Sequence, residues 1–224
     1  MKKFPNEKQK VGSSVCGPLC LLNIYEYLGC DCELDDILED LGIEDKEITY
    51  LPQLALHARK KGLSTKYFQS NPREVSPTWK GQNASRYIEK FKKWIKLQSD
   101  DNIWKKNAGY LVKYIQNGGQ IEIGDLSSKK ISKYLADGYV VLVALEQTWL
   151  WGKRKVKGKI EYDDLKGKAS GHFVVIYGEN EKEFFVSDPY PTKLDNREGL
   201  YKVTKDTLLV SILVWGAQVV GIKK

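Results

Sequence analysis

Four cysteines and two histidines are the residues of this 224-residue chain whose types suit nucleophilic chemistry. Cys16 stands out because it follows a small-residue turn, SSV, and opens an apolar segment, CGPLCLLNIYEYLG. We expect residues 16–28 to form an amphipathic helix, since Pro18 suits a first helical turn and apolar residues recur behind it at three-residue spacing. The positive end of a helix dipole stabilises a thiolate. Cys16 is therefore a candidate nucleophile, with a buried core cysteine as the alternative interpretation of this segment taken alone.

His172 and Asp188 have the spacing of a base and the group that orients it. His172 begins an apolar segment, HFVVIYG, directly after Gly171, and Asp188 ends the next one, EFFVSD. If these segments are antiparallel strands joined by the polar turn GENEKE, the end of the second returns beside the start of the first. A nucleophilic thiol needs such a base, which takes the thiol proton and later donates it to a leaving amine. The alternatives are a core histidine at a strand end and a turn-forming aspartate before Pro189.

The elements that must position these residues change in period along the chain. Helical periodicity dominates the first half and continuous or alternating apolar strands the second, which favours an α+β fold over alternating βαβ units. Helices are predicted at residues 16–28, 34–41, 50–61, 84–97, 104–117 and 126–138, with one helical turn at 204–209. Strands are predicted at residues 63–68, 120–124, 139–146, 171–178, 183–189, 199–203 and 211–222.

The composition predicts one packed domain spanning residues 1–224 and excludes several classes of protein. Apolar residues make up 42% of the chain and aromatic residues 11%, enough for a core. The chain has neither an apolar run long enough for a membrane span nor an N-terminal signal peptide, so we expect a cytoplasmic protein. The formal charge of +7 is spread over the whole length. Because no helix-turn-helix, zinc-finger or RNA-binding motif accompanies it, we expect no nucleic-acid partner.

The remaining cysteines and the second histidine do not form a recognisable metal site. Cys20, Cys30 and Cys32, with or without Cys16, lack the two closely spaced cysteine pairs that structural zinc sites usually have. Burial is the expected fate of Cys20, and His57 reads as a structural or surface residue of its helix. We therefore expect no metal and no cofactor.

Two stretches together, SSVCGPLCLLNIYEYLG and GHFVVIYGENEKEFFVSDP, resemble papain-like cysteine peptidases of the bacteriocin-processing group, which cleave after a double-glycine leader. That family has Cys-Gly-Pro/Ala on a helix, then Gly-His-Phe/Tyr-Val-Val, then a strand ending in Asp-Pro. The intervening segments LPQLALHARKKGLSTKYF and ISKYLADGYVVLVAL are similar to the family's helix–strand units. The resemblance implies a papain-like fold, in which an N-terminal helical part carrying the nucleophile helix packs on a C-terminal antiparallel sheet.

Carried over residue by residue, the resemblance implies a catalytic set. Cys16 would be the nucleophile, His172 the general base and acid, and Asp188 the orienting group. The oxyanion hole would use the Cys16 backbone N–H and the side chain of Gln9, the only glutamine upstream of Cys16. Gln9 stands one residue farther from the cysteine than the family pattern has it, which requires a longer loop between them.

Two segments depart from the family pattern. Residues 70–117 read as a helical insertion that flanks or caps the cleft and influences specificity. The loop at residues 148–170, ahead of His172, is also long. The predicted substrate-binding residues are Gly171, Trp149 and Trp151, and the basic residues Lys153, Arg154 and Lys155 are further candidates for the groove. The alternative for this loop is a solvated hairpin with a packed tryptophan.

The residues and the resemblance together predict a cysteine peptidase that acts on a peptide or protein substrate through an acyl-enzyme. One alternative is an acyl transferase of the same fold, as in transglutaminases and phytochelatin synthases. Another is a peptide-binding module without turnover. The family's best-known members are fused to membrane ABC transporters, so leader-peptide processing does not follow from the resemblance. The sequence does not indicate an oligomeric state.

Overall fold

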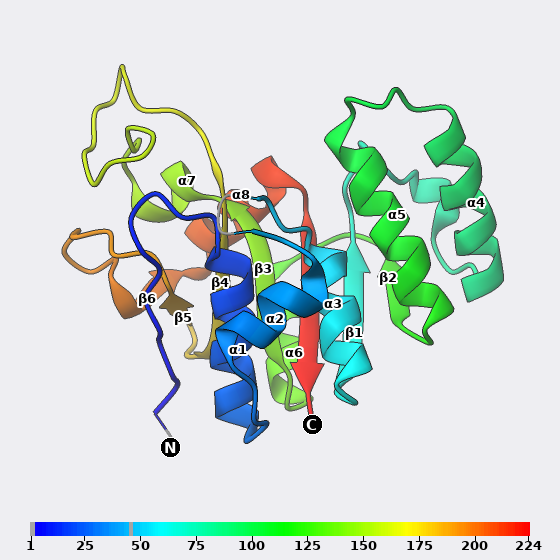
Figure 1. Ribbon diagram of the computed structural model, residues 1–224, viewed down its shortest axis with the longest axis horizontal. Coiled ribbons are helices and arrows are strands. Elements are labelled where there is room, and N and C mark those ends of the chain that lie inside the picture. Colours follow the sequence, from blue (N-terminus) through cyan, green and yellow to red (C-terminus); the bar gives the residue numbers. More distant parts are fainter. Residues whose placement is uncertain (1–2, 45–46) are drawn as a thin grey trace.

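A single sheet runs through the molecule and takes strands from both halves of the chain (Figure 1). The structure is a computed structural model that describes residues 3–44 and 47–224. Within these residues seven strands pair in the order β2-β1-β7-β3-β4-β5-β6, with β1 and β2 parallel and the other neighbours antiparallel. The strands are β1 (Ser64–Gln69), β2 (Gln120–Ile123), β3 (Val140–Glu146), β4 (Gly171–Glu179), β5 (Glu183–Asp188), β6 (Gly199–Thr204) and β7 (Gln218–Lys223).

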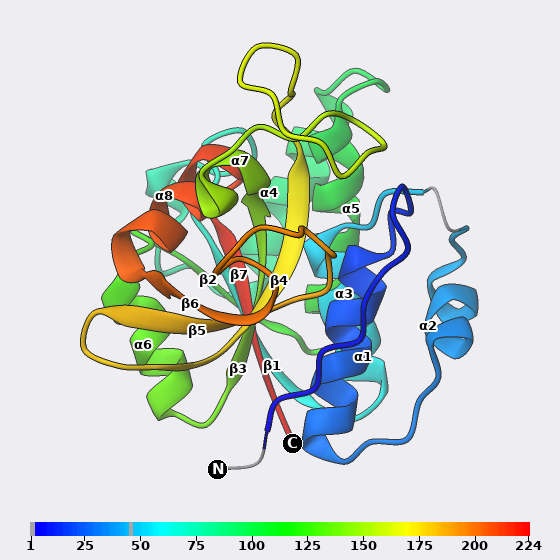
Figure 2. The ribbon, with the colours of Figure 1, turned by 90° about the vertical axis from the view of Figure 1, so that its left-hand side faces the viewer.

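Helices cover both faces of this sheet (Figure 2). One face carries α1 (Cys16–Leu28), α2 (Leu34–Leu41) and α3 (Leu51–Lys60), with α5 (Ile103–Gln116) against α3 and α4 (Ala84–Lys96) against α5. The other face carries α6 (Ser128–Ala136), α7 (Gln147–Trp151) and α8 (Lys205–Trp215). A short 3₁₀ turn, η1 (Pro77–Trp79), precedes α4.

Strand β3 shows why the centre of the sheet has a continuous apolar sequence. All of its residues, VVLVALE, are buried. Leu142 and Ala144 belong to the apolar cluster shared with α1 and α3, whereas Val141 and Val143 belong to the cluster on the side of α6 and α8. A strand covered on both faces needs apolar residues at every position rather than at alternate ones.

The predicted α+β class is confirmed, with two differences in detail. The hairpin of β4 and β5 forms as predicted. The sheet also recruits β1 and β2 from the first half of the chain. The prediction of a final strand over residues 211–222 was wrong in its first part, because residues 211–215 complete helix α8. Buried Leu208 and Ile212 are four residues apart on that helix, and their packing overrides the strand preference of the β-branched residues around them.

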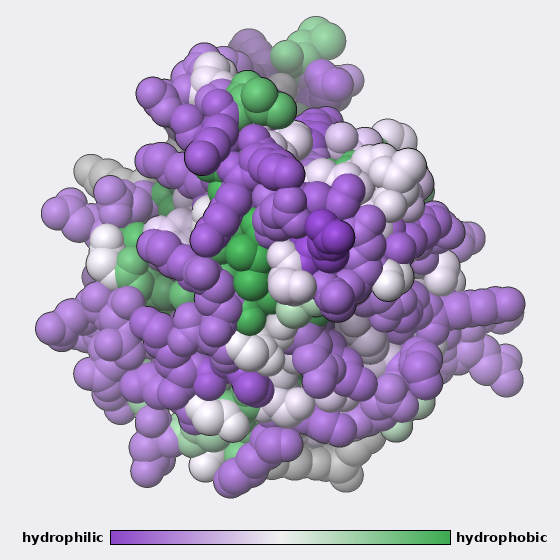
Figure 3. Space-filling view, turned by 90° about the vertical axis from the view of Figure 1, so that its right-hand side faces the viewer, coloured by the Kyte–Doolittle hydropathy of each residue, from purple (hydrophilic) through white to green (hydrophobic). Residues whose placement is uncertain are grey.

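The segment at residues 70–117 leaves the sheet after β1 and returns as β2, beside the strand it left (Figure 1). The side of the molecule that carries α4 and α5 is mostly hydrophilic, with narrow hydrophobic areas between polar side chains (Figure 3). Asn83 and Asn102 cap the two helices by accepting hydrogen bonds from backbone N–H groups of the first turn. The description of this segment as an insertion into the family pattern stays a prediction.

The helices in the described part of the chain are short. The longest, α5, has 14 residues. None of those helices is long and apolar enough to cross a membrane.

Candidate active site

Cys16 is the first residue of α1, where the first backbone N–H groups have no partner within the helix. The next residue, Gly17, lets this helix end approach its neighbours closely. A Cβ atom built on Gly17 would lie 2.4 Å from Thr49 Oγ1 and 3.3 Å from Phe173 Cδ2. Since real Cβ atoms do not approach other heavy atoms to 2.4 Å, a larger residue at position 17 would push this end of α1 and Thr49 apart.

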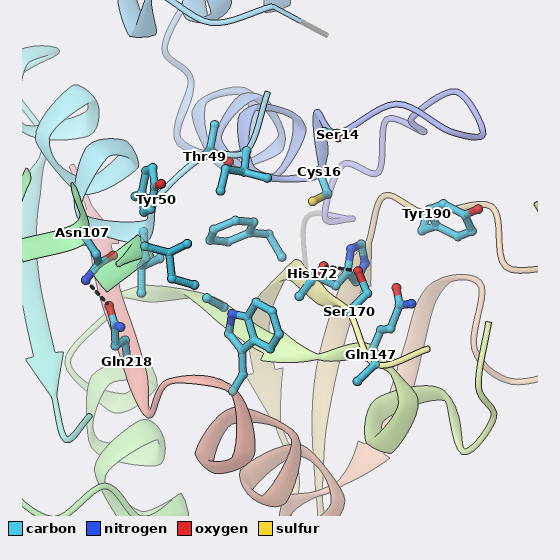
Figure 4. A pocket seen from close by; sticks show the side chains of 18 of the residues that line it. Ser14, Cys16, Thr49, Tyr50, Asn107, Gln147, Ser170, His172, Tyr190 and Gln218 are labelled. Atoms are coloured by element: carbon cyan, nitrogen blue, oxygen red, sulfur yellow. Dashed lines mark hydrogen bonds between the residues drawn. The ribbon is translucent and has the colours of Figure 1, made fainter. Parts of the chain in front are cut away.

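His172 is placed near Cys16 by the start of β4, an interior strand of the sheet. It is the second residue of β4, is paired with Leu145 of β3, and is only 4% exposed. Its Nε2 atom lies 2.7 Å from Asp188 Oδ1. The side chains of His172 and Cys16 line the same cavity (Figure 4), and Cys16 is among the groups that raise the pKa of His172. Because Nε2 bonds the Asp188 carboxylate, Nδ1 is the ring nitrogen available to the Cys16 sulfur.

Asp188 is fully buried at the end of β5, and its carboxylate accepts four hydrogen bonds. Besides His172, Oδ1 accepts one from the Tyr190 backbone N–H at 2.9 Å. Oδ2 accepts one from Trp151 Nε1 at 3.0 Å and one from the Tyr201 hydroxyl at 2.9 Å. A buried carboxylate remains charged when donors surround it in this way, so Asp188 is held in the orientation that faces His172.

The charges of the three side chains are coupled. Burial disfavours the imidazolium, but the charge of the Asp188 carboxylate, the hydrogen bond that it accepts from His172 and the interaction with Cys16 prevail and raise the pKa of His172 to about 10. Against burial, the charge of His172 and hydrogen bonds from His172 and Trp151 hold the pKa of Asp188 below its usual value. By contrast, burial raises the pKa of the Cys20 thiol well above its usual value. The arrangement thus favours a charged imidazolium beside Cys16 and a neutral thiol at Cys20.

Gln9 lines the same cavity as Cys16, and a turn separates the two residues in the chain. Its backbone N–H donates to Pro189 O at 2.9 Å, which ties the N-terminal arm to the end of β5. The turn at residues 10–13 includes Gly12 at φ 85°, a conformation that favours glycine. The Gln9 Nε2 donates to Ser13 O at 3.0 Å, and its Oε1 is buried with no hydrogen-bond donor among the described residues. The second N–H of Nε2 is therefore free to donate elsewhere.

A cavity of about 410 Å³ opens beside these side chains (Figure 4). Cys16, Gln9 and His172 lie in its wall, so the three line one space. Further parts of the wall come from the residues before α3, from α5, from the start of β4 and from the end of α8. Representative residues of these parts are Tyr50, Asn107, Phe173 and Trp215.

Gly171 lines this cavity, and Trp215 packs directly on its backbone. A Cβ atom on Gly171 would lie 2.1 Å from Trp215 Cζ2. Any larger residue at position 171 would therefore displace the indole from the cavity wall. This packing supports the predicted place of Gly171 in substrate binding, which stays a prediction.

Residues of the loop at 148–170 were predicted to line the groove, and only some of them lie at the cavity. Trp151 was predicted to line the groove, but it is 4% exposed, lies under His172 and bonds Asp188, so that prediction is corrected. Trp149 is 58% exposed and is not among the residues that line this cavity. Lys155 lines it, whereas Lys153 and Arg154 line a separate surface hollow.

The second histidine belongs to a different, structural cluster. Tyr25 and His57 share a hydrogen bond of 2.6 Å, and His57 Nε2 lies 3.1 Å from Asp40 Oδ2, so the ring links α1, α2 and α3. Burial lowers the pKa of His57. Within the described residues no group of three or more His, Cys, Asp or Glu side chains could hold a metal ion.

Several residues around the site carry no signal in the sequence. Tyr201 reaches Asp188 from β6, and Asn107, Trp104 and Trp215 reach the cavity from α5 and α8. They are far from Cys16 and His172 in the chain and belong to no motif. Tyr190, two residues after Asp188, is the one that a search around the Asp-Pro motif would find.

This cysteine–histidine–aspartate arrangement, on a helix that packs against an antiparallel sheet, defines the papain-like class of fold. The chain belongs to the Peptidase C39-like family, whose family model matches residues 1–215. A putative C39-like peptidase from Bacillus anthracis shares this fold at 12% identity and a TM-score of 0.52, with 99% of this chain and 95% of that chain covered.

A second similar structure is the peptidase domain of Streptococcus ComA, described as a bifunctional ABC transporter involved in a quorum-sensing pathway. It matches at 12% identity and a TM-score of 0.45, with 99% of this chain and 98% of that chain covered. No curated protein matches the chain. Family and fold together are those of cysteine peptidases.

Proposed function

We propose that the chain is an active cysteine peptidase that hydrolyses an amide bond of a peptide or protein substrate, with residues 1–224 forming one peptidase domain. The observation that carries the proposal is the bonding of His172. Its Nε2 is 2.7 Å from a fully buried carboxylate, and its other side faces the thiol at a helix N-terminus. A base held on one side and facing a nucleophile on the other is the arrangement that acyl transfer needs.

The proposed reaction has two halves. In the first, the Cys16 sulfur attacks the substrate carbonyl carbon, and the His172 imidazolium gives its proton to the leaving amine as the C–N bond breaks. In the second, neutral His172 takes a proton from water, the hydroxide attacks the thioester, and the C–S bond breaks to release the acid and restore the thiolate. Asp188 keeps the ring in place throughout and stabilises its charged form.

Gln9 and the Cys16 backbone N–H are the proposed oxyanion donors. The support is that Gln9 and Cys16 line the same cavity, that Nε2 of Gln9 has a second N–H, and that Cys16 begins α1; such donors stabilise the negative charge that develops on the carbonyl oxygen. Trp151 and Tyr201 do not reach this region. In the proposal they are positioning residues that act through Asp188.

The test compares the wild-type chain with Cys16→Ala, His172→Ala and the matched control Cys32→Ala on a mixed peptide library. Mass spectrometry should show cleavage by wild type and Cys32→Ala and none by the other two variants. Iodoacetamide at mildly acidic pH should label Cys16 before Cys20, Cys30 and Cys32, because only a thiolate reacts quickly. Cleavage by Cys16→Ala, or equal labelling of all four cysteines, would contradict the proposal.

The same experiment separates the two alternatives. If added amines appear covalently in the products, the chain is an acyl transferase of this fold. If no product forms while Cys16→Ala and wild type bind the same peptides, it is a binding module.

A further inference from the structure

The cavity beside Cys16 has an apolar middle and a polar far end. Its middle is walled by Leu51 of α3, Ile103 and Trp104 of α5, Phe173 of β4 and Trp215 of α8. At the far end lie Asn107 of α5 and Gln218 of β7, joined by the hydrogen bond drawn in Figure 4. A ligand reaching from the sulfur to that end passes along two indole rings before it meets a polar group.

The polar end is held by a buried carboxylate. Glu74 is 1% exposed, and it accepts hydrogen bonds from four side-chain amides. Asn107 Nδ2 lies 2.7 Å from its Oε1, and Gln218 Nε2 lies 3.2 Å from its Oε2. Gln69 and Asn71 donate to Oε2 at 2.9 and 3.0 Å. Among the described residues no cationic side chain pairs with Glu74, so amide N–H groups are its side-chain partners.

These bonds leave one acceptor facing the cavity. The acceptor of Gln218 is used, because its Oε1 accepts from Asn107 and from the Tyr67 hydroxyl, while its Nε2 donates to Glu74. The amide nitrogen of Asn107 is likewise used, for Glu74 and Gln218. The Asn107 Oδ1 accepts no hydrogen bond from any residue in the described ranges. Because Asn107 Nδ2 donates to Glu74, the amide is polarised, which strengthens Oδ1 as an acceptor.

We propose that this cavity is a specificity pocket for a bulky side chain with an apolar body and a hydrogen-bond donor at its tip, tyrosine or tryptophan, whose donor meets Asn107 Oδ1. The inference rests on the proposed function, since it names the substrate residue bound beside Cys16. A glycine in this position would leave the apolar middle of the cavity unfilled. An aromatic ring buries large apolar area against the indoles and keeps its polar tip bonded.

The expected difference in affinity between tyrosine and phenylalanine follows from one hydrogen bond. Phenylalanine fills the same walls but offers Asn107 Oδ1 no donor. A single neutral hydrogen bond contributes about 0.5–1.5 kcal/mol, which corresponds to roughly two- to twelvefold in affinity. Glycine lacks both the ring and the donor and should bind more weakly still.

The test measures binding to the full-length Cys16→Ala variant, so that turnover plays no part. The probes are capped pentapeptides Gly-Gly-X-Gly-Gly, with X as tyrosine, tryptophan, phenylalanine, leucine, lysine or glycine, titrated by calorimetry. Tyrosine and tryptophan should bind tightest, and phenylalanine roughly two- to twelvefold more weakly than tyrosine. Equal affinity for tyrosine and phenylalanine, tighter binding of lysine, or equal affinity for glycine would each overturn the inference.

A second variant assigns the preference to its residue. Asn107→Leu in the Cys16→Ala background should abolish the difference between tyrosine and phenylalanine, while Asn117→Leu, at the exposed end of the same helix, should preserve it. A tyrosine preference that survives Asn107→Leu would place the donor contact elsewhere and overturn the inference. If Asn107→Leu fails to fold, the peptide series on Cys16→Ala alone still decides.

The two proposals fail in different ways. If the wild-type chain cuts no peptide but Cys16→Ala shows the tyrosine preference, the peptidase proposal fails and the pocket stands. If the wild-type chain cuts peptides without regard to X, the pocket inference fails and the peptidase proposal stands.

Discussion

At the scale of single residues, the site depends on groups that orient a carboxylate rather than on the reacting atoms alone. Asp188 faces His172 because Trp151, Tyr201 and the Tyr190 backbone take up its remaining lone pairs. Loss of one donor leaves the carboxylate buried but free to turn. We then expect His172 to lose its alignment with Cys16 while it keeps its charge.

The Trp151→Phe variant tests this orienting role by removing a single hydrogen bond to Asp188. The change keeps a ring under His172 but removes the Nε1–H that donates to Asp188. We expect the peptide-cleavage kcat to fall about fivefold, equivalent to about 1 kcal/mol, with KM unchanged, because the residue does not line the cavity. Steady-state kinetics on one cleaved peptide measures both values.

Trp149→Phe is the matched control, since this neighbouring tryptophan on α7 is 58% exposed. It should leave kcat and KM unchanged. A rise in KM with an unchanged kcat for Trp151→Phe would show that the indole acts on substrate binding instead.

At the scale of elements, the cavity exists because β4 and α8 approach each other at a glycine. Gly171 begins β4, and the Trp215 ring at the end of α8 occupies the space where a side chain would be. Gly171→Ala should therefore push Trp215 away, raise KM for bulky substrates and lower the free energy of unfolding. Overpacking of this kind typically costs about 1–3 kcal/mol. Chemical denaturation and Trp fluorescence report the two effects.

Gly109→Ala is the opposite case on α5. A Cβ atom at Gly109 meets no heavy atom within 4 Å, and the residue is inside a helix. This variant should increase the free energy of unfolding by about 0.5–1 kcal/mol and leave KM unchanged. If both glycine variants shift stability in the same direction, the packing of Trp215 on Gly171 is not the cause.

At the scale of the whole molecule, Glu74 joins segments that are distant in the chain. Its amide partners come from β1, the following loop, α5 and β7. Burial raises the pKa of this carboxyl to about 7, against the opposing effect of the hydrogen bonds from Asn107, Asn71 and Gln69. In the unfolded chain the same group ionises near pH 4.5.

The raised pKa predicts a pH-dependent stability. Between about pH 4.5 and 7 the unfolded chain releases the proton and the folded chain retains it, so the free energy of unfolding falls as pH rises. Glu74→Gln cannot ionise and lacks this contribution. The difference in unfolding free energy, wild type minus Glu74→Gln, should therefore decrease over this interval.

Urea denaturation at several pH values measures that difference. Glu89→Gln, at an exposed ion pair on α4, is the control and should not reproduce the decrease. A difference independent of pH would mean that Glu74 stays charged throughout.

The sequence by itself determined the local features of this protein. The helix that begins at Cys16, the continuous apolar strand before the long loop, and the hairpin that returns Asp188 to His172 all follow from periodicity and turn residues. These depend on neighbours along the chain, which a sequence displays. The α+β class and the family followed from their order.

Only the tertiary structure decided what surrounds those residues. It assigned residues 211–215 to a helix and placed Trp151 on Asp188 rather than in the groove. It also brought Asn107 and Trp215 to the cavity, with Glu74 bonded to Asn107. Each of these outcomes depends on contacts between segments more than thirty residues apart, such as Trp151 with Asp188 at a separation of 37. Packing against distant partners competes with local conformational preference, and which of the two prevails is decided only in the folded chain.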